Sequence, residues 1–169
     1  MESPNQDARP DPKDISLIVI HAISLPPGEF GGPGVGQLFT NTLPSGEHPF
    51  YETILSLKVS AHLFVRRDGS IVQFVDFNRR AWHAGVSAFR GRHAVNDFSI
   101  GIEVEGTDKD PFEAIQYERL KQILNALTAE YPSIDRENVV GHEHIAPERK
   151  WDPGPCFDWK RIGVAKPGA

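Results

Sequence analysis

Cysteine is almost absent from this sequence of 169 residues, in which Cys156 is the only one. A single thiol cannot form a disulfide within the chain, so packing must stabilise the fold, and the composition suits a reducing cytoplasm. Basic charge is not in excess either, since 18 Lys and Arg stand against 23 Asp and Glu, for a net charge of -5. We therefore expect no nucleic-acid partner, because phosphate binding needs clustered cations.

Long apolar runs are missing as well. No stretch approaches the roughly 18–20 apolar residues that span a bilayer, so we expect no membrane partner. Residues 1–14 are polar and contain proline, without the basic start and apolar run of a secretory signal. The sequence thus predicts a polar leader over residues 1–14, a single domain over 15–163, and a C-terminal tail over 164–169. We expect this domain to be monomeric.

Two short β-branched runs predict buried strands that lead into histidines. Ile15 to Ile20 (ISLIVI) ends at His21, and residues 138–140 lead into Gly141 and His142. Between them, Leu25 to Gly36 is rich in glycine and proline, which predicts a long loop at the rim of a site. That loop lacks the Gly-Lys-Ser/Thr ending of a nucleotide-binding phosphate loop.

A hairpin, an alternating strand and an amphipathic helix complete the pattern. Asp68-Gly69 separates residues 62–67 from 70–75 and favours a tight two-residue turn. Residues 98–106 alternate, with Phe98, Ile100, Ile102 and Val104 on one face and Ser99, Gly101, Glu103 and Glu105 on the other. Residues 111–131 carry apolar side chains at helical spacing, and Pro132 ends the helix. The sequence predicts an α/β fold with a mixed central sheet flanked by helices.

Two histidines at predicted strand ends and one aspartate in the turn that follows could bind a catalytic zinc ion. Such an ion usually takes three ligands from His, Asp, Glu or Cys and keeps its fourth position for water, and His21, His142 and Asp152 supply these residue types. Taken singly, each histidine is more often a hydrogen-bonded structural residue. Zinc lowers the pKa of bound water to about 7, which makes it a nucleophile able to attack an amide.

A carboxylate and a cation would complete such a site. Glu103 could accept the proton of the water, and Gly101 on the same strand face would leave room for substrate or metal. The alternative is a solvated carboxylate, the role expected for Glu105. Lys150, two residues before Asp152, could stabilise the oxyanion that forms, although a surface lysine is the usual alternative.

Several long motifs resemble one enzyme family. They are VIHAISLPPGEFGG around His21, VSAHLFVRRDGSIVQFV, RAWHAGVS, NDFSIGIEVEGTD around Glu103, and GHEHIAPERKWDPGP with PCFDW. In this order, from about Ser3 to Trp159, the chain resembles the AmpD-type 1,6-anhydro-N-acetylmuramyl-L-alanine amidases. The resemblance implies the fold that these amidases share with peptidoglycan-recognition proteins, and a muropeptide substrate whose muramic acid–L-alanine bond is cleaved in cytoplasmic cell-wall recycling.

The same resemblance assigns roles to individual residues. It places one Zn²⁺ per chain on His21, His142 and Asp152, the catalytic carboxylate on Glu103 and the transition-state cation on Lys150. Further substrate contacts are expected from four residues, which are Trp82, His83, Arg67 and Ala146. Residues 82–85 (WHAG) could line a sugar or peptide groove, since an aromatic ring lies beside two small residues.

Two other readings stay open. A non-catalytic muropeptide-binding module would use the same fold, although it would typically lack a ligand or the base. A metal-independent hydrolase could pair Cys156 with His142, but nothing near this thiol clearly lowers its pKa. The other histidines, which are His48, His62, His93 and His144, are expected to be structural or exposed.

Three positions depart from the family pattern. Ala22 follows the first ligand where asparagine is usual, Ala94 replaces a frequent arginine, and His144 replaces a common aspartate. The loss of an arginine would weaken the grip on stem-peptide carboxylates. The preference for anhydro-muropeptides over intact peptidoglycan is therefore not predicted from the sequence.

Overall fold

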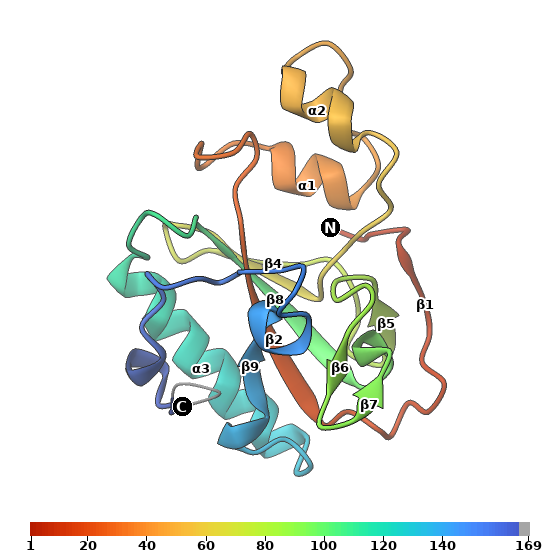
Figure 1. The fold of residues 1–169 in the computed structure, drawn as a ribbon, viewed down its shortest axis with the longest axis vertical. Coiled ribbons are helices and arrows are strands. Elements are labelled where there is room, and N and C mark those ends of the chain that lie inside the picture. The colour runs from red at the N-terminus through yellow and green to blue at the C-terminus, as the bar shows by residue number, and fades with distance from the viewer. Residues whose placement is uncertain (166–169) are drawn as a thin grey trace.

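A mixed five-stranded sheet forms the centre of the computed structural model, which describes residues 1–165 (Figure 1). The strand order is β4-β3-β8-β2-β9. The bounds are β2 Leu17–Ile23, β3 Leu63–Val65, β4 Ile71–Gln73, β8 Ser99–Glu105 and β9 Val139–Gly141. All pairs are parallel except the β3–β4 hairpin. The predicted α/β fold with a mixed central sheet is confirmed.

The two long central strands are buried on both faces. β2 pairs with β8 in parallel, and the register sets His21 opposite Glu103. In β8, Ile100, Ile102 and Val104 face the cluster beneath α3, as their alternation predicts. Phe98 precedes the strand and packs in the opposite cluster, so its predicted face was wrong. The odd-numbered residues of both strands face away from α3, which puts His21 and Glu103 on one side.

Helix α3 (Ala114–Glu130) covers one face of the sheet, with the 3₁₀ helix η3 (Trp159–Ile162) beside it (Figure 1). Its buried stripe includes Leu120, Leu124 and Leu127. The helix starts later than predicted, because the Glu113 backbone N–H donates to the Gln116 side chain at 2.9 Å in a capping box. Apolar burial against the sheet stabilises this layer.

The opposite face carries the shorter elements. Helices α1 (Gly34–Phe39) and α2 (Pro49–Ile54) lie together at one end of the molecule (Figure 1). The remaining elements are β5 Arg79–Ala81, β6 Ala88–Phe89, β7 Arg92–His93, η1 Val95–Asp97, η2 Arg136–Asn138 and α4 His142–Ile145. The glycine-rich loop ends at Pro33, three residues before the predicted end at Gly36, because α1 begins at Gly34. No helix within residues 1–165 is long and apolar enough to cross a bilayer.

The segment predicted as a polar leader is built into this domain. It forms β1 (Gln6–Ala8), which pairs antiparallel with β5, and Ser3, Asn5 and Arg9 are buried. The boundary at residue 14 is thus not a structural boundary, because buried polar side chains here find partners in the body of the fold. Of the predicted tail, residues 166–169 lie outside the described residues.

The hairpin is confirmed, but its turn differs from the predicted one. The Gly69 N–H donates to the Arg66 carbonyl at 2.9 Å, and only Gly69 of the Asp68-Gly69 pair has a positive φ, +80°. The loop is therefore three residues long with glycine at its left-handed position. The Asp68 carboxylate instead accepts from the Ser70 N–H and hydroxyl.

Candidate active site

Three side chains from separate elements converge at the carboxyl end of β2. His21 lies in β2, two residues before its end, and not after it as predicted. His142 is the first residue of α4, directly after β9. Asp152 lies in the turn that follows α4, and its own backbone carbonyl accepts the Glu143 N–H at 2.9 Å. The parallel strands β2 and β9 bring the two histidines to the same edge of the sheet.

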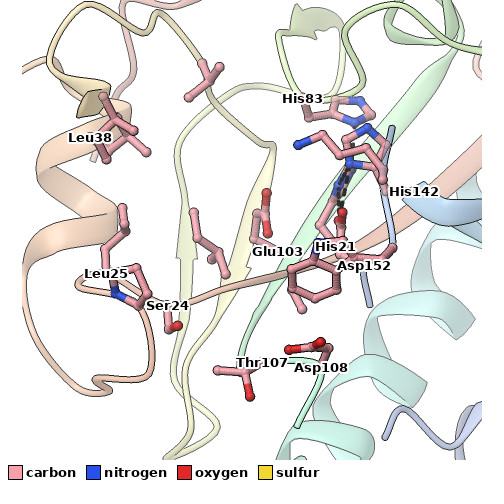
Figure 2. Close-up of a pocket in the computed structure, with 18 of the residues that line it drawn as sticks. His21, Ser24, Leu25, Leu38, His83, Glu103, Thr107, Asp108, His142 and Asp152 are labelled. Carbon is pink, nitrogen blue, oxygen red and sulfur yellow. Dashed lines mark hydrogen bonds and ion pairs between the residues drawn. The ribbon is translucent and has the colours of Figure 1, made fainter. Parts of the chain in front are cut away.

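The three side chains are close enough to share one ion. The Nδ1 atoms of His21 and His142 are 3.0 Å apart, and Asp152 Oδ2 lies 3.1 Å from the first and 3.2 Å from the second. All three residues are buried, and within residues 1–165 they form a group of side chains that could hold a metal ion (Figure 2). Their convergence satisfies the condition on which the predicted metal site depended.

Burial and mutual contact shift the titration of this group. Burial raises the pKa of Asp152, but close contact with His142 and His21 outweighs that effect and lowers the pKa below its usual value. Burial lowers the pKa of His21 to about 4, against the opposing effect of Asp152. Both shifts favour an ionised carboxylate and a neutral imidazole, which are the forms that bind metal.

Glu103 projects from β8 beside this group (Figure 2). It is only 9% exposed, and its Oε2 atom has no hydrogen-bond partner among residues 1–165. Burial raises the pKa of Glu103 well above its usual value, as does the nearby Asp152, while Lys150 has the opposite effect. A raised pKa suits a carboxyl group that has to accept and return a proton.

Lys150 is placed by a tight turn after α4. The Ala146 carbonyl accepts the backbone N–H groups of Arg149 at 3.0 Å and of Lys150 at 2.9 Å. Lys150 lines the same cleft as the three converging residues and Glu103. Ala146 is not among the residues that line that cleft, and its carbonyl holds the turn, so its predicted substrate contact stays a prediction.

The site opens into a cleft of about 640 Å³. Figure 2 shows the histidines, Asp152 and Glu103 at one end, with Leu25 and Leu38 across the cleft. The wall opposite the polar end is largely apolar and includes Phe50, Ile54 and Leu57. A polar reactive end facing an apolar wall is typical of a site for an amphipathic ligand.

Two other predicted substrate contacts lie outside this cleft. The Arg67 guanidinium binds the Pro111 carbonyl at 3.2 Å, forms an ion pair with Glu113 and stacks on Phe30. Trp82 pairs its backbone with Ser60 and its side chain with Asp7. Neither residue is among those that line the cleft within the described part of the chain.

His83 does line the cleft, but it is bonded to a converging histidine. Its Nδ1 lies 2.9 Å from His21 Nε2, and its Nε2 lies 3.1 Å from Ser99 Oγ. The space left by Gly101 is occupied by this ring, and not by substrate or metal as predicted, since a Cβ on Gly101 would lie 2.4 Å from His83 Cγ. Asn96 and Ser99, which hold this segment, were missed because sequence spacing carries no sign of their contacts.

Glu105 is not the solvated carboxylate that the sequence predicts. It is 3% exposed, and its oxygens accept the Gly31 N–H at 2.6 Å and the Arg67 N–H at 2.9 Å. Glu105 thereby ties the glycine-rich loop to the hairpin turn. This role is structural, since both acceptor oxygens are used by backbone donors.

The three departures from the family pattern lie at different distances from the reactive end. Ala22 lines the cleft beside His21. Ala94 is exposed, with a positive φ of 58° at the start of η1. His144 faces away from the three converging residues, since its Nδ1 accepts the Gly141 N–H at 2.9 Å and its ring packs on Trp159. Cys156 and His144 line a separate hollow on the surface.

Known proteins with this sequence pattern are amidases. The model of the N-acetylmuramoyl-L-alanine amidase family matches residues 11–155. The chain is 57% identical over 160 residues to the 1,6-anhydro-N-acetylmuramyl-L-alanine amidase AmpD of Citrobacter freundii, covering 95% of this chain and 85% of that protein. It is 55% identical over 162 residues to AmpD of Escherichia coli strain K12, covering 96% and 88%.

Solved structures agree with the sequence comparison. The crystal structure of a selenomethionine AmpD derivative has a TM-score of 0.94 and 54% identity, over 98% of this chain and 93% of that chain. The amidase AmiD from E. coli, in complex with the substrate anhydro-N-acetylmuramic acid-L-Ala-D-γ-Glu-L-Lys, has a TM-score of 0.64 and 33% identity, over 90% and 58%. The predicted resemblance is confirmed, and the chain belongs to the N-acetylmuramoyl-L-alanine amidase family.

Proposed function

We propose that this protein hydrolyses the amide bond between 1,6-anhydro-N-acetylmuramic acid and L-alanine, with one zinc ion bound by His21, His142 and Asp152. The observation that carries the proposal is the convergence of these three ligand atoms beside Glu103, at the end of an apolar cleft. The identity of more than half to AmpD over most of both chains supports the substrate.

The donor set suits zinc in type and in spacing. With zinc bonds of about 2.0–2.1 Å, the edges of a coordination tetrahedron come to about 3.3 Å. The three ligand atoms lie 3.0 to 3.2 Å apart, close to such edges. Two imidazoles and one carboxylate would hold the ion, and catalytic zinc sites with three protein ligands keep one position for water.

Glu103 is the proton carrier in this proposal. When bound, zinc would supply a water of pKa about 7 as the nucleophile. The Glu103 carboxylate, opposite His21 on the neighbouring strand, takes the proton of the attacking water and returns it to the leaving L-alanine nitrogen. Its raised pKa suits both steps, because a carboxyl group that is less acidic than usual accepts a proton more readily and can then donate it.

Lys150 stabilises the negative charge that develops on the carbonyl oxygen. The turn that holds its backbone also leads directly to Asp152, so the cation is placed before the substrate binds. A preorganised cation in a partly dry cleft stabilises an oxyanion more strongly than one in open water. The apolar wall of Leu38, Phe50 and Leu57 receives the uncharged parts of the muropeptide.

The amidase activity is tested by supplying anhydro-muropeptide and intact sacculi to the purified protein, each with and without a chelator. We expect release of stem peptide from the anhydro-muropeptide, loss of release on chelation, and recovery when zinc is restored. Cleavage of sacculi at the same rate would remove the preference for the anhydro form. Binding without cleavage in the zinc-loaded protein would favour a muropeptide-binding module. The cytoplasm, which the AmpD resemblance implies, is the compartment that we propose for this reaction.

Replacement of the base separates catalysis from metal binding. The variant Glu103→Gln should retain one zinc per chain and lose activity by roughly 10²–10⁴-fold, because the amide cannot accept the proton of the water. Glu118→Gln, an exposed change on α3, is the matched control and should keep full activity. Steady-state rates and zinc content are measured on the same samples. Full activity in Glu103→Gln would exclude Glu103 as the base.

A further inference from the structure

Both ligand histidines face the metal position with Nδ1, so each turns its Nε2 away from it. The Nε2 of His21 lies 2.9 Å from His83 Nδ1, and the Nε2 of His142 lies 3.1 Å from the Ala84 carbonyl oxygen. Two consecutive residues of one short segment thus contact the rear of both imidazoles. A carbonyl oxygen can only accept, so His142 carries its proton on Nε2 and presents an unprotonated Nδ1.

The proton on His21 is fixed in the same way through a longer chain of hydrogen bonds. Ser99 Oγ donates its single hydrogen to the Val95 carbonyl at 2.6 Å. The same oxygen must then accept the Nε2–H of His83 at 3.1 Å. A neutral His83 with its proton on Nε2 offers an unprotonated Nδ1, which accepts the Nε2–H of His21. The Nδ1 of His21 is thereby left free for metal.

The segment that carries these contacts is held firmly on two sides. Asn96 Oδ1 accepts the His83 N–H at 3.1 Å and the Ala84 N–H at 2.8 Å. The His83 ring fills the space above Gly101, where even a Cβ would lie 2.4 Å from its Cγ. Arg149 Nη2 adds a bond to the Ala84 carbonyl at 2.8 Å. The ring and the carbonyl have little freedom to move away from the ligand histidines.

We propose that His83 is a positioning residue of the metal centre, which, with Ser99 and the Ala84 carbonyl, fixes both ligand histidines with the proton on Nε2 before zinc binds. The inference rests on the zinc function proposed above and deepens it. Partners behind metal-binding histidines fix ring orientation and tautomer, and their loss typically weakens metal binding or activity by 10–100-fold. His83 therefore acts through His21 and not on the substrate.

Two variants separate the hydrogen bond from packing. His83→Leu fills the space but cannot accept from His21, whereas His83→Asn places an amide oxygen near the position of Nδ1. Zinc dissociation constants are measured by competition with a chromophoric chelator. We expect His83→Leu to bind zinc roughly 10–100-fold more weakly than wild type. His83→Asn should lie closer to wild type than to His83→Leu.

A milder variant keeps the test sharp if His83→Leu does not fold. Ser99→Ala removes only the oxygen that orients His83, and it should weaken zinc binding by less than His83→Leu does. Ser3→Ala is the matched control, because Ser3 is also fully buried and donates to a carbonyl, that of Phe39 at 2.5 Å, far from the metal group. Ser3→Ala should leave the zinc dissociation constant unchanged.

Nitrogen NMR of the zinc-loaded protein reports the proton positions directly. We expect a coupling across the hydrogen bond between His21 Nε2 and His83 Nδ1, with the His83 proton on Nε2. A His83 proton on Nδ1, or zinc affinities in His83→Leu and Ser99→Ala equal to wild type, would overturn the proposal. If the wild-type protein itself binds no zinc, the proposed function fails instead, so the two failures are distinct.

Discussion

At the residue scale, the core histidine His62 makes the fold sensitive to acid. It is fully buried, accepts the Gly101 N–H and donates to the Arg79 carbonyl. Burial, assisted by the charge of the neighbouring Arg9, lowers the pKa of His62 to about 3. Because an unfolded histidine titrates near 6.5, the unfolded state binds the extra proton between about pH 3 and 6.5. Stability from this residue is present above pH 6.5 and is lost as the pH falls.

The variant His62→Gln tests this acid sensitivity. Linkage assigns His62 a loss of about 2 kcal/mol in unfolding free energy between pH 7 and pH 5. The variant is less stable at pH 7, since it loses packing and hydrogen bonds, but its stability should fall less steeply with acid. Urea unfolding of both proteins at the two pH values gives the slopes. Equal slopes in the two proteins would contradict the assignment.

The three converging residues could be predicted from the sequence more readily than the contacts that surround them. His21 and His142 are recognisable because each comes at the end of a β-branched run, and Asp152 because it lies in a long motif with His142. The structure brings the three together. Whether a strand carboxylate is solvated depends on segments far away in the chain. Glu105 bonds Gly31 and Arg67, so its burial could not be predicted from the alternation of β8.

At the scale of the elements, hydrophobic periodicity predicted the sheet and the long helix. β8 and α3 each bury a face large enough to impose a repeat on the sequence, and β2, buried on both faces, gives a continuous apolar run. β1 and β5 escaped prediction because they are three residues each and are joined by backbone pairing and by the Arg80–Asp7 ion pair at 2.6 Å. Such short polar strands have no alternation of apolar residues from which a strand could be predicted.

Gly101 in β8 tests how closely this strand approaches the His83 segment. A Cβ at Gly101 would lie 2.4 Å from His83 Cγ, so Gly101→Ala must displace the ring. We expect a loss of about 1–3 kcal/mol in unfolding free energy, the usual cost of overpacking. Weaker zinc binding should accompany it. Gly32→Ala is the control, because its nearest neighbour is the Leu25 carbonyl oxygen at 3.8 Å. Chemical denaturation and chelator competition measure both effects, and a stable, tightly binding Gly101→Ala would contradict this packing argument.

At the scale of the whole molecule, the first nine residues act as a strap that joins distant parts of the fold. Ser3 and Asn5 bond the Phe39 carbonyl at the end of α1. Ser60 donates to the Asn5 carbonyl at 2.7 Å, which connects the strap to the segment before β3. Polar composition suggested a leader here, because a sequence pattern cannot show that polar side chains will find buried partners. The assignment of a domain boundary therefore required the tertiary structure.

Arg9 provides the strongest test of this strap. Its guanidinium is buried and donates to four carbonyls, those of Phe77, Asn96, Asp97 and Ser99, at 2.7 to 3.1 Å. Burial lowers the pKa of Arg9 to about 10, so the cation persists at neutral pH. The variant Arg9→Met keeps the apolar stem but leaves these acceptors unpaired, and it should lower the unfolding free energy by about 3 kcal/mol or more.

The exposed Arg90 is the matched control for Arg9. Arg90→Met removes the same charge at the surface, where changes usually stay within about 0.5 kcal/mol. Urea unfolding at pH 7 compares the two variants with wild type. Because Asn96 and Ser99 also hold His83, Arg9→Met should weaken zinc binding as well, whereas Arg90→Met should not. Equal stability of the two variants would mean that residues 1–9 lie on the domain without supporting it.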